Sequence, residues 1–298
     1  MFSEFYYGAH MSIKKGIPSA ISEINELGGN LIQIFVSNPM STKIAVSKFT
    51  DNIITSIKNK MHDTNSKIVI HMPYVINLAK PLPPKIEDCW WINMICNQLT
   101  ISDSINSIGC VVHVGKYLDL TESDGLDNML NAFRHIIKFI KDKEMKTYII
   151  LETAAGQGSE LISNMDDFMD FYNKFTKEEK NYIKICIDTC HIFTAGYDIK
   201  KEENVKKFFD DFNEKVGIEH ITLIHLNDSK TDCGTCVDRH ANLGEGKIGL
   251  TGLRHFIRYA AHYKIPLVLE TPGDNLDKEI NLITKVKNGV NKWSNSQK

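Results

Sequence analysis

Short apolar runs alternate with longer amphipathic segments along the whole chain. The runs are rich in Ile, Leu and Val, which is typical of strands that are buried on both faces of a parallel sheet. Eight such runs are expected to be strands: Phe5–His10, Leu31–Val36, Lys67–His71, Cys110–Val114, Thr147–Glu152, Ile183–Asp188, Ile221–Leu226 and Pro266–Glu270.

The segments between these runs carry apolar residues at helical spacing. They predict helices over Ile17–Leu27, Lys48–His62, Glu87–Ile108, Leu126–Lys143, Met165–Phe175, Glu203–Val216, Leu250–Tyr263 and Asp277–Val290. Eight strand–helix repeats in 298 residues indicate an α/β protein with the (β/α)₈ architecture of a TIM barrel. No low-complexity linker interrupts the pattern, so residues 1–298 are expected to form one domain.

An open, doubly wound sheet is the alternative fold. Nucleotide-binding sheets of that class carry glycine-rich loops that cradle phosphates. No G-x-G-x-x-G follows the first predicted strand, and G-x-x-x-x-G-K-[ST] is absent from the chain. The barrel is therefore the preferred interpretation.

Composition restricts the partners and the compartment. A net charge of −2 provides no global basic field for nucleic acid, so binding of DNA would need a local attraction or bound cations. The chain lacks an apolar run of transmembrane length and a signal-peptide pattern at its start, which predicts an intracellular protein without a membrane segment. Seven cysteines, an odd number, favour thiols in a reducing compartment, whether cytoplasm, nucleus or virus particle. No heptad pattern or apolar surface stripe argues against a monomer.

Acidic and imidazole side chains stand at the ends of six successive predicted strands. The C-terminal ends of barrel strands meet at one mouth, so these groups are expected to face a common centre. The set consists of His71, His113, Glu152, Asp188, His225 and Glu270. Three further groups follow the sixth and seventh strands: His191, Asp238 and His240.

Each of these residues also has a structural interpretation. A strand-end histidine can be satisfied by core hydrogen bonds, and Asp188 can cap a helix. Four carboxylates gathered without cations would repel one another, however, and their pKa values would rise. Mixed nitrogen and oxygen ligands suit zinc, with manganese or iron as substitutes, and nine ligands exceed what one tetrahedral zinc ion uses. Spacing alone thus predicts a hydrolase with two or three metal ions.

Longer motifs are more specific than this spacing. They occur in one order along nearly the whole chain: G-A-H-M-S (8–12), H-M-P-Y-V-I-N-L-A (71–79), H-V-G (113–115), L-E-T-A-A-G-Q-G-S (151–159), C-I-D-T-C-H-I-F-T-A-G-Y-D (186–198), H-L-N-D-S-K (225–230), V-D-R-H-A-N-L-G-E-G-K-I-G (237–249) and L-E-T (269–271). This set resembles the endonuclease IV family, whose members repair DNA at abasic sites.

The resemblance implies three zinc ions, with Mn²⁺ or Fe²⁺ as substitutes. The first would be held by His71 and His113, with Glu152 bridging it to the second. The second would be completed by Asp188, His225 and Glu270. The third would be held by His191, Asp238 and His240.

The resemblance also implies a reaction and a substrate. The family hydrolyses the phosphodiester 5′ to an abasic site in duplex DNA during base excision repair, leaving a 3′-hydroxyl and a 5′-deoxyribose phosphate. The expected partners are duplexes with abasic sites or with blocked 3′ ends that need trimming. Glu152 and Glu270 are the candidate catalytic groups, which would orient the attacking hydroxide as well as bind metal. Bound cations would supply the positive charge that the net charge of −2 lacks.

DNA contacts are expected from residues in the loops around the mouth. The candidates are Met40, Tyr74, Asn77, Gln157, Lys230 and Arg239. Asn77 and Gln157 have structural alternatives in shaping their loops, and Lys230 and Arg239 can be solvated loop charges. His10 is a candidate for orienting metal ligands.

One departure from the family concerns the loop after the second strand. The family tends to carry there an arginine that enters the DNA stack, whereas this chain reads Ser37-Asn38-Pro39-Met40-Ser41. An apolar wedge can also open base steps, so Met40 is the candidate replacement.

A C-x-x-C motif, Cys233 to Cys236, lies in the loop before Val237. A single motif of this kind can consist of ordinary loop cysteines, form a disulfide or redox pair, or bind an additional metal ion. Without a second pair the motif specifies none of these, and ordinary loop cysteines are the preferred interpretation.

Two other functions are compatible with a barrel of this kind. A sugar isomerase or epimerase would use one or two metals and would leave His191, Asp238 and His240 without a role. A barrel that binds damaged DNA without cutting it would be expected to lack a ligand, and all nine positions are filled.

Overall fold

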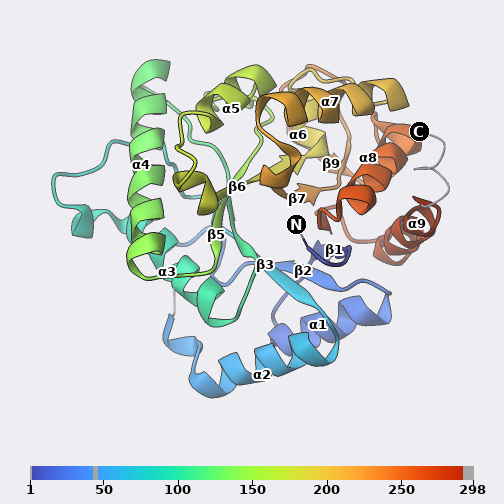
Figure 1. The fold of residues 1–298 in the computed structure, drawn as a ribbon, viewed down its shortest axis with the longest axis horizontal. Coiled ribbons are helices and arrows are strands. Elements are labelled where there is room, and N and C mark those ends of the chain that lie inside the picture. The colour runs from blue at the N-terminus through green and yellow to red at the C-terminus, as the bar shows by residue number, and fades with distance from the viewer. Residues whose placement is uncertain (1, 43–45, 291–298) are drawn as a thin grey trace.

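The computed structural model describes residues 2–42 and 46–290. Eight parallel strands close into a barrel, and helices surround it (Figure 1). In their order around the barrel the strands are β1 (Tyr7–His10), β10 (Leu267–Leu269), β7 (Ile221–His225), β6 (Ile183–Asp188), β5 (Tyr148–Glu152), β4 (Gly109–Val112), β3 (Lys67–His71) and β2 (Leu31–Ile34). The predicted TIM barrel is confirmed, and the open sheet is excluded because β1 pairs with both β2 and β10.

The helices follow the strands in the predicted alternation. Their bounds are α1 (Ile17–Glu26), α2 (Asp51–Asp63), α3 (Trp90–Ser104), α4 (Glu122–Asp142), α5 (Met165–Tyr172), α6 (Thr189–Thr194), α7 (Glu202–Lys215), α8 (Gly249–Tyr263) and α9 (Leu276–Asn288). No helix in residues 2–42 and 46–290 is long and apolar enough to cross a membrane.

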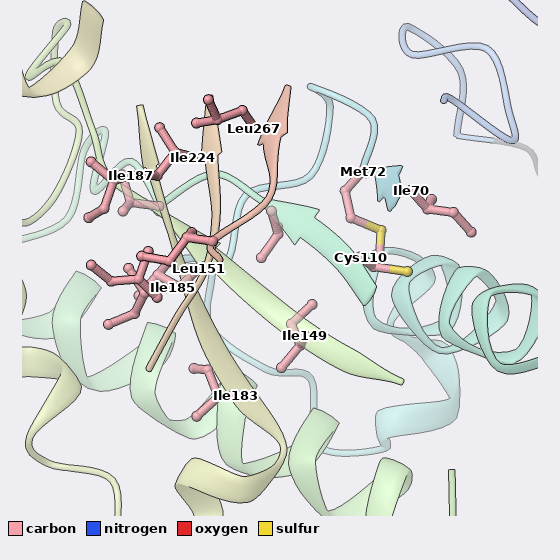
Figure 2. Close-up of a cluster of buried hydrophobic side chains, with 14 of the residues drawn as sticks. Ile70, Met72, Cys110, Ile149, Leu151, Ile183, Ile185, Ile187, Ile224 and Leu267 are labelled. Carbon is pink, nitrogen blue, oxygen red and sulfur yellow. The ribbon is translucent and has the colours of Figure 1, made fainter. Parts of the chain in front are cut away.

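Alternation along the strands separates two apolar layers. Every second side chain of a strand points outward and packs beneath the helices, as Ile149, Leu151, Ile185 and Ile187 do in Figure 2. The side chains between them fill the barrel interior. That inner layer consists of Tyr6, Leu31, Val69, Ile108, Val111, Ile150, Cys186, Leu223 and Val268.

Two local features differ from the expected elements. The short helix α6 was not predicted: Asp188 caps a helix that starts at Thr189, and a turn follows at Ala195-Gly196. The loop after β7 contains a small antiparallel pair, β8 (Asp228–Ser229) with β9 (His240–Ala241). Pairs of two residues carry no periodic signal, so pattern analysis cannot find them.

Candidate metal centre

A polar side chain lies near the end of every barrel strand, or directly after it, at the C-terminal mouth. In seven strands this side chain comes two residues after a member of the inner apolar layer, as His71 follows Val69 and Glu152 follows Ile150. Strand alternation therefore points it into the barrel at the level above that layer. The eight side chains are His10, Gln33, His71, His113, Glu152, Asp188, His225 and Glu270.

The nine predicted ligands lie in three groups whose ligand atoms are within 4.8 Å of one another. The first group consists of His71, His113 and Glu152. The second group consists of Glu152, Asp188, His225 and Glu270. The third group consists of His191, Asp238 and His240. A further combination, Asp188 with Cys190 and His240, overlaps the second and third groups.

Glu152 connects the first and second groups. Its Oε2 lies 3.4 Å from His71 Nε2 and 3.2 Å from His113 Nε2. Its Oε1 lies 2.9 Å from His225 Nδ1. Because the two oxygens face different histidines, this buried carboxylate can bridge two cations.

The third group is held by the loop ahead of β9 and by α6. Asp238 Oδ2 lies 3.3 Å from His191 Nε2, and Asp238 Oδ1 lies 3.2 Å from His240 Nε2. Asp188 accepts a hydrogen bond from the backbone N–H of His191 at 2.9 Å, which starts α6 and places the imidazole. The cap interpretation of Asp188 is therefore correct, and its other oxygen still faces His225 and His240.

Backbone carbonyls orient three of the histidine rings. The Nδ1 of His71 donates to Met72 O at 2.8 Å, that of His191 to Thr153 O at 2.7 Å, and that of His240 to Glu270 O at 3.1 Å. A proton held on Nδ1 leaves the lone pair on Nε2, the atom that faces each ligand group. This arrangement is the usual support of a metal-binding imidazole.

Charge interactions dominate the titration of the site. Burial alone would raise the pKa of Glu152, but the imidazoles of His113 and His225 lower it well below its usual range. Burial would lower the pKa of His240, yet Asp188 and Asp238 raise it to about 9. His191 likewise has a pKa well above its usual range, because the carboxylates around it outweigh its burial. Without bound ions, positively charged imidazolium rings therefore offset the negative charge of the carboxylates.

Two atoms test whether cations fit this site. Glu152 Oε2 and His240 Nε2 are buried, and within the described part of the chain neither makes a well-aligned hydrogen bond, although ionic partners lie 3.2 Å away. Orphaned polar atoms of this kind need an explanation, since leaving one unsatisfied costs about 1–3 kcal/mol. Both point into ligand groups of mixed imidazole and carboxylate character, which is a donor set that suits zinc. The residues fit the expected ions.

We expect metal binding to release protons. The carboxylates around His191 and His240 raise their pKa values and so favour imidazolium rings in the metal-free protein, and each ring must lose a proton before its nitrogen can bind an ion. The apparent affinity of the third group should therefore rise as pH increases toward 9, by roughly tenfold per pH unit for each protonated histidine. Calorimetric titration of metal-free protein in buffers of different ionisation enthalpy measures the released protons. A pH-independent affinity between pH 6 and 8 would contradict this charge assignment.

Comparison with known proteins agrees with the geometry. A family model described as a xylose isomerase-like TIM barrel matches residues 21–293. A putative endonuclease 4 of Acanthamoeba polyphaga mimivirus is 36% identical over 280 residues, covering 92% of this chain and 88% of the relative. The chain belongs to the endonuclease IV family. The crystal structure of endonuclease IV from Thermus thermophilus is 25% identical with a TM-score of 0.77, and the match covers 94% of this chain and 98% of that one.

The fold is shared more widely than the family. A D-tagatose 3-epimerase-like protein matches with a TM-score of 0.71 at 19% identity, covering 97% of this chain and 99% of that one. At that identity the likeness concerns the barrel alone. Distinguishing an endonuclease IV from a sugar epimerase must therefore rest on the residues at the mouth.

A cavity lies beside the first and third groups, and His113 and Asp238 belong to its lining. This cavity of about 400 Å³ is lined by residues that include Tyr74, Lys80, His113, Lys116 and Asp238. Tyr74 is 57% exposed and its ring centroid lies 5.7 Å from that of His113. Met40, in the loop after β2, is the most exposed large apolar residue described, at 73%. Both side chains are free to meet a partner, and their DNA contacts stay predictions.

Two other DNA candidates are occupied by contacts within the protein. The Asn77 amide donates to Lys116 O at 2.8 Å and accepts from the backbone N–H groups of Ala79 and Lys116. These bonds join the loops after β3 and β4, which is the structural role left open by the sequence. Gln157 Oε1 accepts from Asp238 N at 3.2 Å and so helps to place a ligand of the third group.

Lys230 and Arg239 lie opposite each other at the β8–β9 pair. Lys230 N donates to Arg239 O at 2.8 Å, and both side chains are exposed. Arg239 also hydrogen-bonds the carbonyl of Asp238 through its guanidinium. Their position next to the third group is compatible with phosphate contacts, and these contacts stay predictions.

The C-x-x-C loop shows free thiols. All seven cysteines are unpaired, including Cys233 and the exposed Cys236. Neither belongs to any cluster of three metal-capable side chains in residues 2–42 and 46–290. Backbone bonds from Gly234 and Cys236 to α6 give the loop an ordinary structural role.

Several supporting residues were not singled out from the sequence. Asn227 is fully buried, donates to Asp188 Oδ2 at 2.8 Å and accepts from Glu270 N at 2.9 Å, so it joins two ligands of the second group. Thr153 accepts from Asp188 N at 3.0 Å. Both stand next to or within motif residues, but only the three-dimensional contacts show what they do.

Asp228 organises the loop that follows the third group. Its fully buried carboxylate accepts from the backbone N–H groups of Gly244, Gly246, Ile248 and Gly249. A side chain at Gly246 would collide with it, since a Cβ there would lie 2.5 Å from Asp228 Oδ1. The glycine-rich segment after His240 thus wraps around one carboxylate.

Replacing Asp228 by asparagine should destabilise the protein. The asparagine amide offers one accepting oxygen and turns an N–H₂ group toward backbone donors, so charge-assisted bonds are lost and donors stay unpaired. We expect a loss of about 3 kcal/mol in the free energy of unfolding, measured by denaturant titration. Asp119→Asn, at an exposed carboxylate, is the matched control and should change it little. Equal stability of the two variants would contradict this role for Asp228.

Proposed function

We propose that this protein is a metal-dependent endonuclease that hydrolyses the phosphodiester 5′ to abasic sites in duplex DNA. The products would be a 3′-hydroxyl and a 5′-deoxyribose phosphate, and the same site would trim blocked 3′ ends. The observation that carries the proposal is the presence of three ligand groups at one barrel mouth, with Glu152 shared between two of them. Relatives named endonuclease 4, similar over most of the chain, support it.

Three zinc ions are the proposed cofactors, with Mn²⁺ or Fe²⁺ as substitutes. The first group would hold one ion, the second group another, and the third group the last, with Glu152 as the bridge. When bound, such ions lower the pKa of water and neutralise charge on a phosphoryl group in its transition state. This positive charge would attract a phosphodiester to a protein whose net charge is −2.

The carboxylates would act as hydrogen-bond acceptors during the reaction. Imidazoles lower the pKa of Glu152 well below its usual range, and those of His225, His71 and His240 outweigh burial and lower the pKa of Glu270 to about 2. Both groups are therefore ionised near neutral pH. An ionised carboxylate can orient an attacking water or hydroxide by accepting its proton in a hydrogen bond, but it cannot serve as a general acid.

The remaining candidates would position the DNA around this site. Tyr74 and Met40 offer exposed aromatic and apolar surface beside the mouth, suited to stacking or to opening a base step. Lys230 and Arg239 offer positive charge for the phosphate backbone. Gln157 would act mainly through Asp238, and Asn77 mainly through its loop.

A divalent-metal sugar isomerase or epimerase is the alternative, favoured by the shared barrel. Such an enzyme would use the second group and need a base beside the sugar carbon. The third group would have no role in it, although Asp238, His191 and His240 form a set as compact as the other two. The third group therefore favours the endonuclease.

A product assay tests the proposal. Metal-loaded protein is incubated with a labelled duplex that carries one abasic-site analogue, alongside the same duplex without the lesion. We expect one cut, 5′ to the lesion, with a 3′-hydroxyl that a polymerase can extend, and loss of cutting after strong chelation. Turnover of sugars without any cut in the lesion duplex would establish the alternative.

A further inference from the structure

Gln33 is an uncharged amide buried among charged metal-site residues. It lies on β2, points into the barrel two residues after the inner-layer residue Leu31, and is completely shielded from solvent. Burial of a primary amide is costly unless its donors and acceptor are satisfied. Here the partners are polar side chains at the mouth: His10, His225 and Glu270.

Each end of the amide contacts a different ligand of the second group. Gln33 Oε1 lies 2.8 Å from His225 Nε2, and Gln33 Nε2 lies 2.5 Å from Glu270 Oε1. The second amide hydrogen faces His10 Nδ1 at 3.2 Å. Donors and acceptor are thus all used, and two of the three bonds reach residues from other strands that belong to one proposed ion site.

The contact with Gln33 fixes one proton of the second group. An amide oxygen only accepts hydrogen bonds, so His225 must carry a hydrogen on Nε2. The lone pair of a neutral His225 then lies on Nδ1, which is 2.9 Å from Glu152 Oε1 and 3.1 Å from Glu270 Oε2. Likewise, donation to Glu270 Oε1 leaves Oε2 facing the same point.

We infer that Gln33 is a positioning residue of the second group: its amide selects the His225 tautomer that presents Nδ1 to an ion and turns Glu270 Oε2 toward that ion. The position requires a side chain that both donates and accepts hydrogen bonds. A carboxylate at this position would repel Glu270, and a lysine could not accept from His225. The inference rests on the proposed metal function, and it concerns ion binding rather than DNA cleavage.

Metal content and metal affinity test the inference without any activity assay. Gln33→Met keeps a similar volume and removes the hydrogen bonds. We expect this variant to be purified with one ion per chain fewer than the unchanged protein, or to bind that ion about 10- to 100-fold more weakly in competition with a chelator. Gln33→Glu, which keeps the acceptor but replaces the donor, should also bind the ion more weakly.

Gln98→Met is the matched control. Gln98 is equally buried, but it lies on α3 and its amide reaches Ser37 rather than a ligand. This variant should keep the full metal content. Unchanged metal content and affinity in Gln33→Met would overturn the inference.

A measurement on the unchanged protein covers the case in which Gln33→Met fails to fold. Long-range ¹H–¹⁵N spectra of zinc-loaded protein distinguish the protonated from the metal-bearing nitrogen of each histidine. We expect the proton of His225 on Nε2, whereas those of His71, His191 and His240 lie on Nδ1. A His225 proton on Nδ1 would overturn the inference. If the protein binds its ions but cuts no DNA, the proposed substrate is wrong and the role of Gln33 stands.

Discussion

Glu152→Gln is expected to reduce cleavage of abasic DNA by about 10³-fold or more. Glu152 is almost fully buried, and its two oxygens face the first and second groups. A glutamine keeps the shape but loses the charge, and its N–H₂ group would be turned toward one set of ligands. Both sites should therefore bind their ions more weakly, which elemental analysis of the purified variant measures together with kcat/KM.

Glu219→Gln is the control for this experiment. Glu219 lines a cavity with Lys184 and Lys264 at the opposite, N-terminal end of the barrel, so its substitution should leave both metal content and cleavage unchanged. A Glu152→Gln protein with full metal content and at least a tenth of the original kcat/KM would show that Glu152 does not bridge the ions.

Asp238→Asn is expected to remove one ion selectively. Asp238 contacts both His191 and His240, and these imidazoles, against the effect of its partial burial, lower its pKa far below the usual value for aspartate. The amide is a weaker ligand without charge, so the third group should lose its ion while the first and second keep theirs. We expect cleavage to fall by about 10²-fold or more, since the lost ion would no longer stabilise charge on the phosphate.

This substitution also separates the two candidate functions. Asp232→Asn, at an exposed carboxylate in the same loop, is the control and should behave like the unchanged protein. The proposed endonuclease would need the third group, whereas a sugar isomerase would not. Loss of the ion from Asp238→Asn without loss of activity on the true substrate would favour the isomerase.

The barrel could be predicted because its signal is repeated and local. Strands such as Lys67–His71 are continuous apolar runs, and their predicted bounds match the structure. Helix bounds were less accurate where a capping residue, and not the apolar periodicity, determines the start of the helix. Helix α4 begins at Glu122, directly after the Thr121 cap and four residues before the predicted start at Leu126. The pair β8–β9 and helix α6 were missed because they are too short to show a period.

The candidate ligands could be predicted because they stand at strand ends and in specific motifs. What the sequence could not provide is which side chains support them. Gln33 resembles any polar residue in an apolar run, and Asp228 resembles a turn residue, until their partners from distant strands and loops are known. Asn77 is the opposite case: the sequence suggests a DNA contact, but its amide forms hydrogen bonds that join two loops of the protein itself.

The most direct test of the metal-dependent endonuclease is a titration of metal-free protein with zinc. Bound zinc per chain and the rate of cutting at a single abasic-site analogue in duplex DNA are measured at each step. We predict that cutting 5′ to the lesion appears only as the last ligand group fills, and that it disappears again on chelation. A protein with all three groups filled that leaves the lesion duplex intact would contradict the account.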